Sequence, residues 1–216
     1  MRPFLVLLIL LSPIVCCAQY IDGYVIKSSG DTLRGYIKYP DYNRWVRCPE
    51  YIKFKTDTNS HKVLRFNPHT IREFHIYGHE TYRTYAGLVT ADGNFYPVTG
   101  FALDSSKKQD TIFLKQVITG KHLAFYYQND RFKTRYFISE NNSTPREVVY
   151  HLYFENPNKM IQRPMYTGWL ISLVNKYASG DERLMKKAAE MPFLEPDLED
   201  FVNEINNTAA SQPSGG

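Results

Sequence analysis

The sequence predicts an α+β protein in which an antiparallel β-rich domain of hairpins and a meander is covered by C-terminal helices. Two observations predict this class. Between residues 20 and 138, short runs of β-branched and aromatic residues alternate with Gly, Asn, Asp and Pro turns, without a helix-length crossover. After residue 165, apolar residues instead recur at steps of three and four, which is the period of an amphipathic helix.

The clearest strand pair is a hairpin at the start of the domain. Two runs rich in Val, Ile and Tyr flank a Ser-Ser-Gly-Asp turn. If Ser29-Gly30 form a two-residue loop, Tyr24 lies opposite Gly35 and Tyr36 lies opposite Gly23. Each strand glycine is then covered by a tyrosine from the partner strand, which protects a weak position.

The remaining strands follow from the same alternation. We expect them over residues 51–55, 62–66, 72–77, 80–85, 95–98, 111–118, 122–128 and 132–138, with a loop-rich interval from 87 to 109. Residues 144–154 leave two alternatives open. Thr144 to Glu147 has the layout of a helix capping box, whereas Val148 to Phe154 has the β-branched and aromatic content of a strand, which we favour slightly.

Three C-terminal helices are expected within residues 165–206. The first covers 165–178, the second begins with a capping box at Ser179 to Glu182, and the third begins near Pro196-Asp197. Trp169 alone can bury on the order of 200 Å², so the first helix should dock on a face or an open end of the sheet. The alternative is that the helices form a separate small bundle.

The first 18 residues have the features of a secretory signal peptide. A positive Met1-Arg2-Pro3 precedes an apolar run of about a dozen residues and a small-residue site ending at Ala18. We therefore expect a signal peptide over 1–18, one β-rich domain with its helices over 19–207, and a disordered tail over 208–216. Lipoprotein anchoring at Cys16 or Cys17 is the less favoured alternative. No later segment is apolar enough for a transmembrane helix.

Composition narrows the function classes only a little. The formal net charge is +4, with both signs interspersed, so the charge does not require a nucleic acid or an anionic surface as the binding partner. After cleavage only Cys48 remains, so no intramolecular disulfide is expected, and the cysteine is interpreted as a half-buried small residue rather than a reactive thiol. The 17 tyrosines indicate a sheet face half covered by amphipathic rings, and a carbohydrate or peptide platform has the same signature.

A family resemblance rests on loose structural motifs. The Gly-Tyr-x-Ile and Gly-Asp-Thr-Leu-x-Gly-Tyr-Ile pattern of residues 23–37 resembles a group of uncharacterised exported proteins of Bacteroidetes. Further matches are Ile52-x-Phe54, Ile71 to Gly78, Phe125-Tyr126-Tyr127, Tyr136-Phe137-Ile138 and Leu173-Val174-x-x-Tyr177. In several members this region precedes an outer-membrane β-barrel, and we expect no barrel strands here. The resemblance implies export and fold, and it implies no activity or functional residue.

Candidate sites are weak by sequence alone. The candidate binding surface consists of Tyr82, Tyr85, Tyr126 and Tyr136. His69, His75 and His79 lie within eleven residues and are low-ranked zinc ligands, because His79 is expected at a hairpin tip that points it away from His75. Asp31-Thr32 and Asp110-Thr111 match an O-glycosylation acceptor pattern, although Asp-Thr after a turn is the more ordinary interpretation.

The sequence favours an exported binding module over an enzyme. No catalytic motif, phosphate-binding loop or cofactor motif is found, so neither catalytic residues nor cofactors are assigned. The expected partner is an envelope protein or glycan, and export argues against nucleic acid. The alternative is an envelope hydrolase, which requires a deep pocket holding at least two of His61, His75, His122 and His151 beside an acid.

Overall fold

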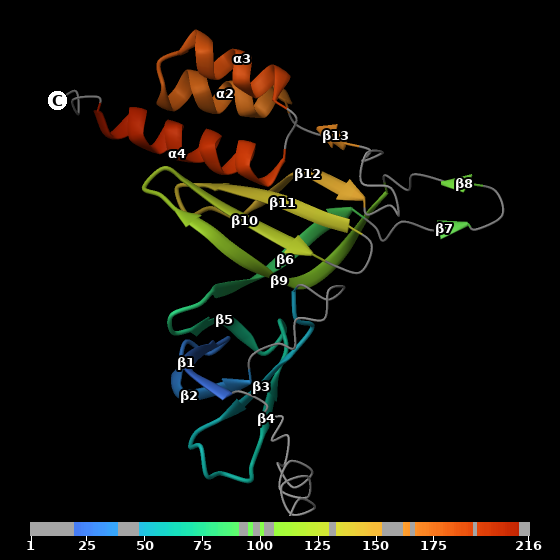
Figure 1. Ribbon diagram of the computed structural model, residues 1–216, viewed down its shortest axis with the longest axis vertical. Coiled ribbons are helices and arrows are strands. Elements are labelled where there is room, and N and C mark those ends of the chain that lie inside the picture. The colour runs from blue at the N-terminus through green and yellow to red at the C-terminus, as the bar shows by residue number, and fades with distance from the viewer. Residues whose placement is uncertain are drawn as a thin grey trace, which may run out of the picture.

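An eleven-stranded antiparallel sheet runs the length of the molecule, and three helices pack at one end of it (Figure 1). The computed structural model describes residues 20–38, 48–90, 95–96, 100–101, 106–129, 133–152, 162–164, 167–191 and 194–211. The expected signal peptide lies outside these residues.

The elements have the following bounds. The first strands are β1 (Tyr20–Lys27), β2 (Thr32–Lys38), β3 (Ile52–Lys55), β4 (Leu64–Phe66), β5 (Ile71–Ile76) and β6 (Thr81–Thr90). The others are β7 (Phe95–Tyr96), β8 (Gly100–Phe101), β9 (Lys107–Thr119), β10 (Leu123–Asn129), β11 (Lys133–Glu140), β12 (Arg146–Leu152) and β13 (Gln162–Pro164). The helices are α2 (Thr167–Tyr177), α3 (Glu182–Glu190) and α4 (Glu195–Ser211). The sheet order is β13-β12-β11-β10-β9-β6-β5-β1-β2-β3-β4, and β7 pairs only with β8.

The predicted fold class is confirmed. All strand pairs of the large sheet are antiparallel, and α4 packs against β9 and β10 while α2 and α3 pack against α4. The open choice at residues 144–154 resolves as strand β12, because this segment pairs with β11 along its length. The loop-rich interval is shorter than predicted, since β6 continues to Thr90 and β9 begins at Lys107.

The first hairpin forms, but its register differs by one residue from the predicted one. Gly23 lies opposite Gly35, so neither glycine faces a tyrosine. The loop has three residues rather than two, because Lys27 N–H donates to Asp31 O (2.8 Å). Gly30 closes it in the left-handed conformation (φ 97°), which is the usual ending of a three-residue hairpin loop.

Neighbouring backbone, rather than tyrosine cover, explains the two strand glycines. A Cβ on Gly23 would lie 2.2 Å from the carbonyl oxygen of His75 in β5. A Cβ on Gly35 would lie 2.2 Å from the carbonyl oxygen of Lys55 in β3. Both glycines therefore let flanking strands approach closely, which is a regular reason for glycine inside a sheet.

Two apolar cores pack on opposite faces of the sheet. The hairpin core consists of Val25, Ile37, Cys48, Ile52, Phe54, Ile71, Phe74, Ile76, Tyr82 and Phe113. The curled core consists of Tyr85, Val89, Leu114, Ala124, Tyr126 and Phe137. Phe113 and Leu114 are adjacent in β9 and belong to different cores, because successive side chains of a strand point to opposite faces. The sheet therefore bends one way around the first core and the other way around the second.

The second bend is strong enough to bring distant strands together. The rings of Tyr85 in β6 and Phe137 in β11 lie 5.2 Å apart, although β9 and β10 separate their strands. In a flat sheet three strand spacings would keep them about 14 Å apart. Thr90 N–H, at the end of β6, also donates to the Glu147 carboxylate in β12 (2.8 Å). Strands β6 and β9–β12 thus form a partly closed barrel.

A third apolar cluster joins the helices to the sheet. This helix core contains Leu123, Phe125, Tyr136, Ile138 and Val148 from the strands, and Leu170, Leu173, Val174, Tyr177, Ala178, Leu184, Ala188, Met191, Leu198, Phe201, Val202 and Ile205 from the C-terminal segment. Trp169 is partly buried against it. The alternative of a separate helical bundle is wrong, because helices and strands share one core.

Two details at the helix ends correct the sequence analysis. The N-cap of α3 is Asp181, whose side chain accepts from Leu184 N–H, rather than Ser179. Helix α4 continues to Ser211, so the disordered tail predicted for 208–216 is wrong for 208–211, and 212–216 lie outside the described residues. The last turns are held because Asn206 exchanges two hydrogen bonds with the Leu123 backbone (3.0 Å each).

A pair of Gly→Ala variants tests the close strand packing. Gly23→Ala should lower the free energy of unfolding by about 2 kcal/mol or more, because its Cβ overlaps the His75 carbonyl. Gly168→Ala in α2 has no atom within 4 Å of the added Cβ and should be neutral or stabilising by up to about 1 kcal/mol. Urea unfolding of both variants measures the contrast. Equal destabilisation by the two variants would contradict it.

Candidate functional site

The side of strands β1–β5 that faces away from the hairpin core carries many rings and cations. This outer face consists of Tyr20, Asp22, Tyr24, Ile26, Thr32, Arg34, Tyr36, Lys38, Lys53, Lys55, Arg65, Glu73, His75 and Tyr77. These positions alternate along each strand with the buried residues of the hairpin core. No described helix lies over them, because α2–α4 pack at the other end of the sheet (Figure 1).

Three rings form an aromatic cluster at the centre of the outer face. Tyr24 stacks on His75 with ring centroids 5.4 Å apart, and Tyr77 meets the His75 ring edge-on at 5.2 Å. Tyr77 is 44% exposed, which is unusual for a large ring in this chain. The cluster therefore offers aromatic surface to a ligand.

Hydrogen bonds hold the rings of the aromatic cluster in place. The Tyr24 hydroxyl donates to Glu73 Oε1 (2.8 Å), and Arg83 Nε donates to Glu73 Oε2 (3.1 Å). His75 Nδ1 lies 2.7 Å from Thr81 Oγ1. Burial, together with the nearby Glu73 carboxylate, raises the pKa of Tyr24 to about 12, so the phenol stays protonated and keeps donating. The cluster is thus ordered before any ligand arrives, which lowers the entropy cost of binding.

Cations lie over two further tyrosine rings near the edge of the outer face. Lys55 Nζ is 4.9 Å from the ring centroid of Tyr20. The Arg65 guanidinium is 4.1 Å from the ring centroid of Tyr51, which is 42% exposed. These cation–π contacts place positive charge beside exposed aromatic surface.

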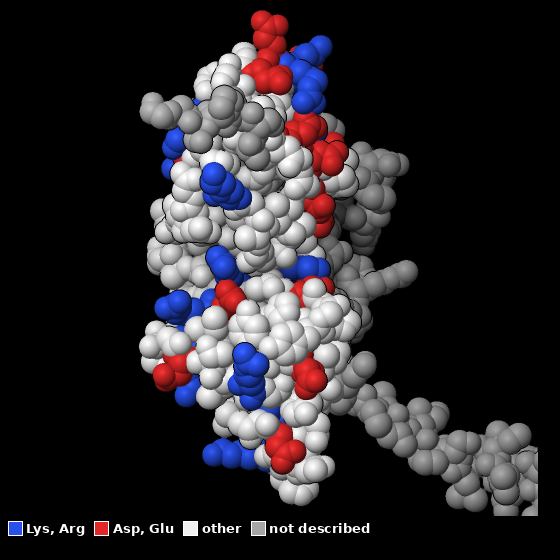
Figure 2. Space-filling model, turned by 90° about the vertical axis from the view of Figure 1, so that its left-hand side faces the viewer, with Lys and Arg blue, Asp and Glu red and all other residues white. Residues whose placement is uncertain are grey.

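Charge on one side of the molecule is mixed. Seen from the left-hand side of Figure 1, Lys and Arg are interspersed with Asp and Glu, and no broad field of one sign covers this face (Figure 2). This agrees with the small net charge of +4. Any charge preference of a site must therefore arise from its own residues rather than from long-range steering.

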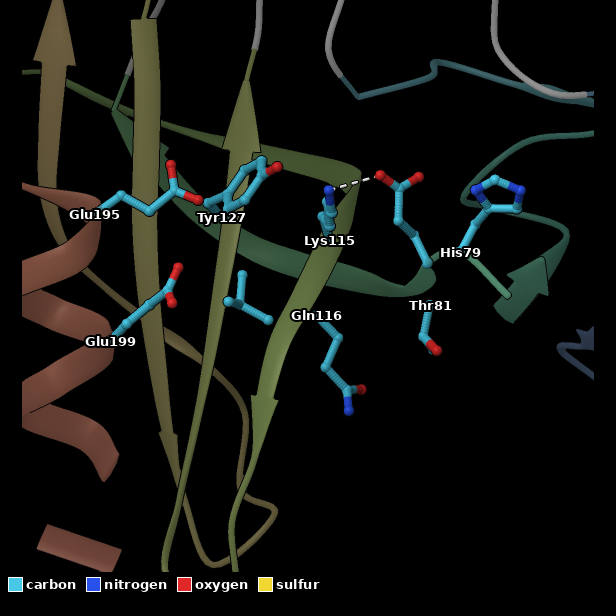
Figure 3. Close-up of a pocket in the computed structure, with 9 residues that line it drawn as sticks. His79, Thr81, Lys115, Gln116, Tyr127, Glu195 and Glu199 are labelled. Carbon is cyan, nitrogen blue, oxygen red and sulfur yellow. Dashed lines mark hydrogen bonds and ion pairs between the residues drawn. The ribbon is translucent and has the colours of Figure 1, made fainter. Parts of the chain in front are cut away.

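A second candidate is a cleft of about 490 Å³ where the helix side of the molecule meets the hairpin core (Figure 3). Its lining comes from the β5–β6 turn, from β9 and β10, and from the first turns of α4. The lining residues are His79, Glu80, Thr81, Lys115, Gln116, Val117, Tyr127, Glu195 and Glu199. Rings and charges of both signs therefore line one hollow.

Lys115 is the central cation of this cleft. Its Nζ donates to Glu80 Oε1 (2.6 Å) and lies 5.3 Å from the ring centroid of Tyr127. Burial opposes the charge on Lys115, but hydrogen bonds to Glu80 and Tyr127 outweigh it, so the pKa lies above its ordinary value. Burial also raises the pKa of the Tyr127 hydroxyl, against the opposing effect of Lys115. Both groups therefore stay protonated at neutral pH.

Cys48 is an internal thiol. It is 8% exposed and belongs to the hairpin core. Its backbone N–H donates to Asn129 O (3.2 Å), and Asn129 N–H donates to its Sγ (3.4 Å). Burial raises the pKa of the thiol to about 12. Cys48 is a packed small residue, as predicted, but it is buried rather than half-buried. Its hydrogen bonds link the β2–β3 connection to the end of β10.

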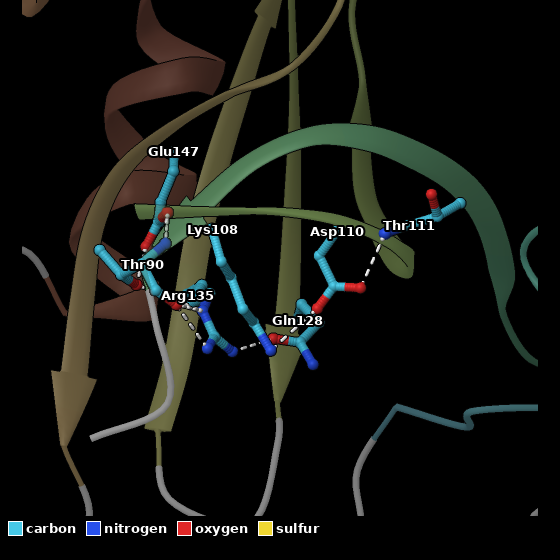
Figure 4. Close-up of polar contacts among 7 residues, drawn as sticks. All are labelled: Thr90, Lys108, Asp110, Thr111, Gln128, Arg135 and Glu147. Atoms are coloured by element: carbon cyan, nitrogen blue, oxygen red, sulfur yellow. Dashed lines mark hydrogen bonds and ion pairs between the residues drawn. The ribbon is translucent and has the colours of Figure 1, made fainter. Parts of the chain in front are cut away.

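The third candidate is a polar cluster inside the partly closed barrel (Figure 4). Arg135 is 2% exposed, and its guanidinium donates to Thr90 O (2.8 and 3.1 Å) and Gln128 Oε1 (2.6 Å). Glu147 is also 2% exposed and accepts from the Thr90 amide and hydroxyl. Because the polar groups are engaged with one another, the cluster holds β6, β11 and β12 together rather than awaiting a ligand.

The predicted tyrosine surface is wrong for all four of its residues. Tyr82 is 0%, Tyr126 2%, Tyr136 5% and Tyr85 6% exposed. Tyr82 stacks on Phe74, and Tyr85 donates from its hydroxyl to Leu88 O. Tyr82 lies in the hairpin core, Tyr85 and Tyr126 lie in the curled core, and Tyr136 lies under the helices, and strand periodicity alone does not reveal this burial. The exposed tyrosines among the described residues are instead Tyr51 and Tyr77, at the ends of β3 and β5.

The predicted histidine ligands do not converge. His75 lies on the outer face, His79 lines the cleft, and His69 is exposed in the β4–β5 turn. Among the described residues, no group of three or more His, Cys, Asp or Glu side chains is placed to hold a metal ion. The two glycosylation candidates differ from each other in exposure, since Thr32 is exposed and Thr111 is half-buried.

The histidines proposed for a hydrolase are likewise dispersed. His61 lies in the β3–β4 connection, and His122 lies in the β9–β10 turn, where its ring is 5.0 Å from that of Tyr177. Neither these two nor His75 lines the cleft. The side chain of His151 lies outside the described residues.

Comparisons with protein-family models, curated proteins and solved structures gave no match to this chain. The resemblance to exported Bacteroidetes proteins therefore stays a prediction. Within the described residues, none of the helices combines the length and the apolar character needed to cross a membrane.

Replacing the central cation of the cleft should destabilise the fold. Lys115→Met leaves the Glu80 carboxylate without its ion pair and should cost about 1–2 kcal/mol of unfolding free energy, because both groups are only partly buried. The double variant Lys115→Met/Glu80→Gln should recover part of this loss. Lys186→Met, on the exposed side of α3, is the control and should change stability by less than about 0.5 kcal/mol. Denaturant unfolding of the set measures the coupling.

Cys48 should resist alkylation in the folded protein. At pH 8 a thiol with a pKa of about 12 is almost entirely protonated, and burial also blocks access. Labelling with iodoacetamide and reading the Cys48 peptide by mass spectrometry should show at least a hundredfold slower modification in buffer than in 6 M guanidinium. Comparable rates in the two conditions would refute the buried position.

Proposed function

We propose that this protein is an exported, non-enzymatic binding module that holds a partner of the cell envelope through its outer face. The leader-like residues 1–18 support export to the periplasm or the cell exterior. The observation that carries the binding proposal is the aromatic cluster of Tyr24, His75 and Tyr77, which is ordered by hydrogen bonds and over which none of the described helices lies.

The chemistry of the described side chains supports binding rather than catalysis. The thiol of Cys48 is buried and protonated, and Lys115 is held as a cation by Glu80. The cleft brings a histidine, a lysine, a tyrosine and carboxylates together, and its lysine is paired with Glu80. By contrast, the outer face needs no rearrangement to contact a ligand, since its rings already lie side by side.

Removal of the most exposed ring of the aromatic cluster tests the proposal. Tyr77→Ala should weaken retention of the purified protein on isolated cell envelopes of the source organism by about tenfold, as is usual for a central aromatic contact. Cosedimentation over a range of protein concentrations measures the apparent Kd.

Leu88→Ala provides the matched control. Leu88 is 54% exposed and belongs to the far half of β6, away from the outer face, so this variant should bind as the unaltered protein does. Equal loss of binding in the two variants, or no envelope binding by the unaltered protein, would overturn the proposal.

A further inference from the structure

The outer face of β1–β4 has a local excess of cations. Its outward positions hold four cations, Arg34, Lys53, Lys55 and Arg65, besides Lys38, which already has a contact of its own, and one carboxylate, Asp22. The other carboxylates of these segments, Asp31, Glu50 and Asp57, lie in turns and connections beyond the strand ends. On neighbouring β5, Glu73 is occupied by Tyr24 and Arg83. The outward positions of β1–β4 therefore carry a net positive charge.

Rings and cations alternate across the strands in register. One row runs His75, Tyr24, Arg34, and the next runs Asp22, Tyr36, Lys55. Neighbouring strands lie about 4.8 Å apart, and successive rows lie about 7 Å apart. Each of these two rows thus places a cation beside a tyrosine, and in the second row Asp22 lies on the other side of Tyr36.

We propose, on the basis of the binding function proposed above, that the ligand of the outer face is an acidic polysaccharide. The apolar C–H side of a sugar ring packs on a tyrosine, and a carboxylate or sulfate on the same sugar pairs with the adjacent Arg or Lys. A polymer of such units matches a surface on which the ring-and-cation unit repeats.

The sheet geometry disfavours a peptide strand as the occupant. Strand addition needs an open edge with unpaired backbone groups, whereas β1 and β2 are each paired on both sides. A polymer that lies across these strands contacts both rows at once.

Two matched pairs of polymers test the inference on the intact protein. Polygalacturonate is compared with its methyl ester, and dextran sulfate is compared with dextran, by isothermal titration calorimetry at 0.15 M NaCl. In at least one pair the charged polymer should bind at least tenfold more tightly than its neutral counterpart, and the affinity should fall as salt screens the charges.

Charge reversal locates the site. Lys53→Glu/Lys55→Glu should weaken binding of the charged polymer by at least tenfold, with the melting temperature used to verify folding. Lys186→Glu, on the exposed side of α3 (74% exposed), is the control and should leave the affinity unchanged. Equal loss in the control variant would mean non-specific attraction and would overturn the inference.

The outcomes separate this inference from the proposed function. If neither charged polymer binds better than its neutral counterpart, while retention on envelopes still depends on Tyr77, the acidic-polysaccharide inference fails and the binding function stands. If retention on envelopes is independent of Tyr77 and no polymer binds, both fail. Tight binding of a neutral polymer alone also overturns the inference.

Discussion

The ladder between β6 and β9 is the pairing on which both halves of the molecule depend. It joins ten residue pairs, from Thr81 with Gln116 to Thr90 with Lys107. Because side chains alternate along these strands, Phe113 contributes to the hairpin core while Leu114 contributes to the curled core. A one-residue slip in this ladder would exchange the two sets of side chains, and both cores would lose their partners at once.

The closed end of the barrel and the open outer face illustrate two uses of polar groups. Inside the barrel, Thr90 joins Arg135 to Glu147 in a water-poor setting, and the pairing replaces the backbone ladder that β6 and β12 lack. On the outer face, Glu73 joins Tyr24 to Arg83, and here the pairing orients a ring that remains accessible. The first arrangement stabilises the shape, and the second prepares a surface for binding.

The fold class follows from sequence periodicity, whereas the binding surface does not. Alternation and helical spacing predict most strands and all three described helices, because each pattern depends on local burial. The predicted register of the first hairpin is wrong by one residue, because Ser28-Ser29-Gly30 suits a two- or three-residue loop equally well. In addition, a contact with β5, which is distant in sequence, requires glycine at position 23. Of the four predicted surface tyrosines, Tyr82 is enclosed in the hairpin core, Tyr85 and Tyr126 in the curled core, and Tyr136 under the helices. Outward parity in β1 and β2 does point to Tyr24 and Tyr36, but only once their register is known.

The two outermost strands of the sheet, β4 and β13, are three residues long, whereas the longest strands, β6 and β9, lie at its centre. Each margin therefore exposes a strand of only about 10 Å, and β13 ends in a proline that cannot donate a hydrogen bond. A neighbouring copy finds little backbone to pair with at either margin. Short outer strands of this kind limit edge-to-edge pairing between copies of a β-sheet protein.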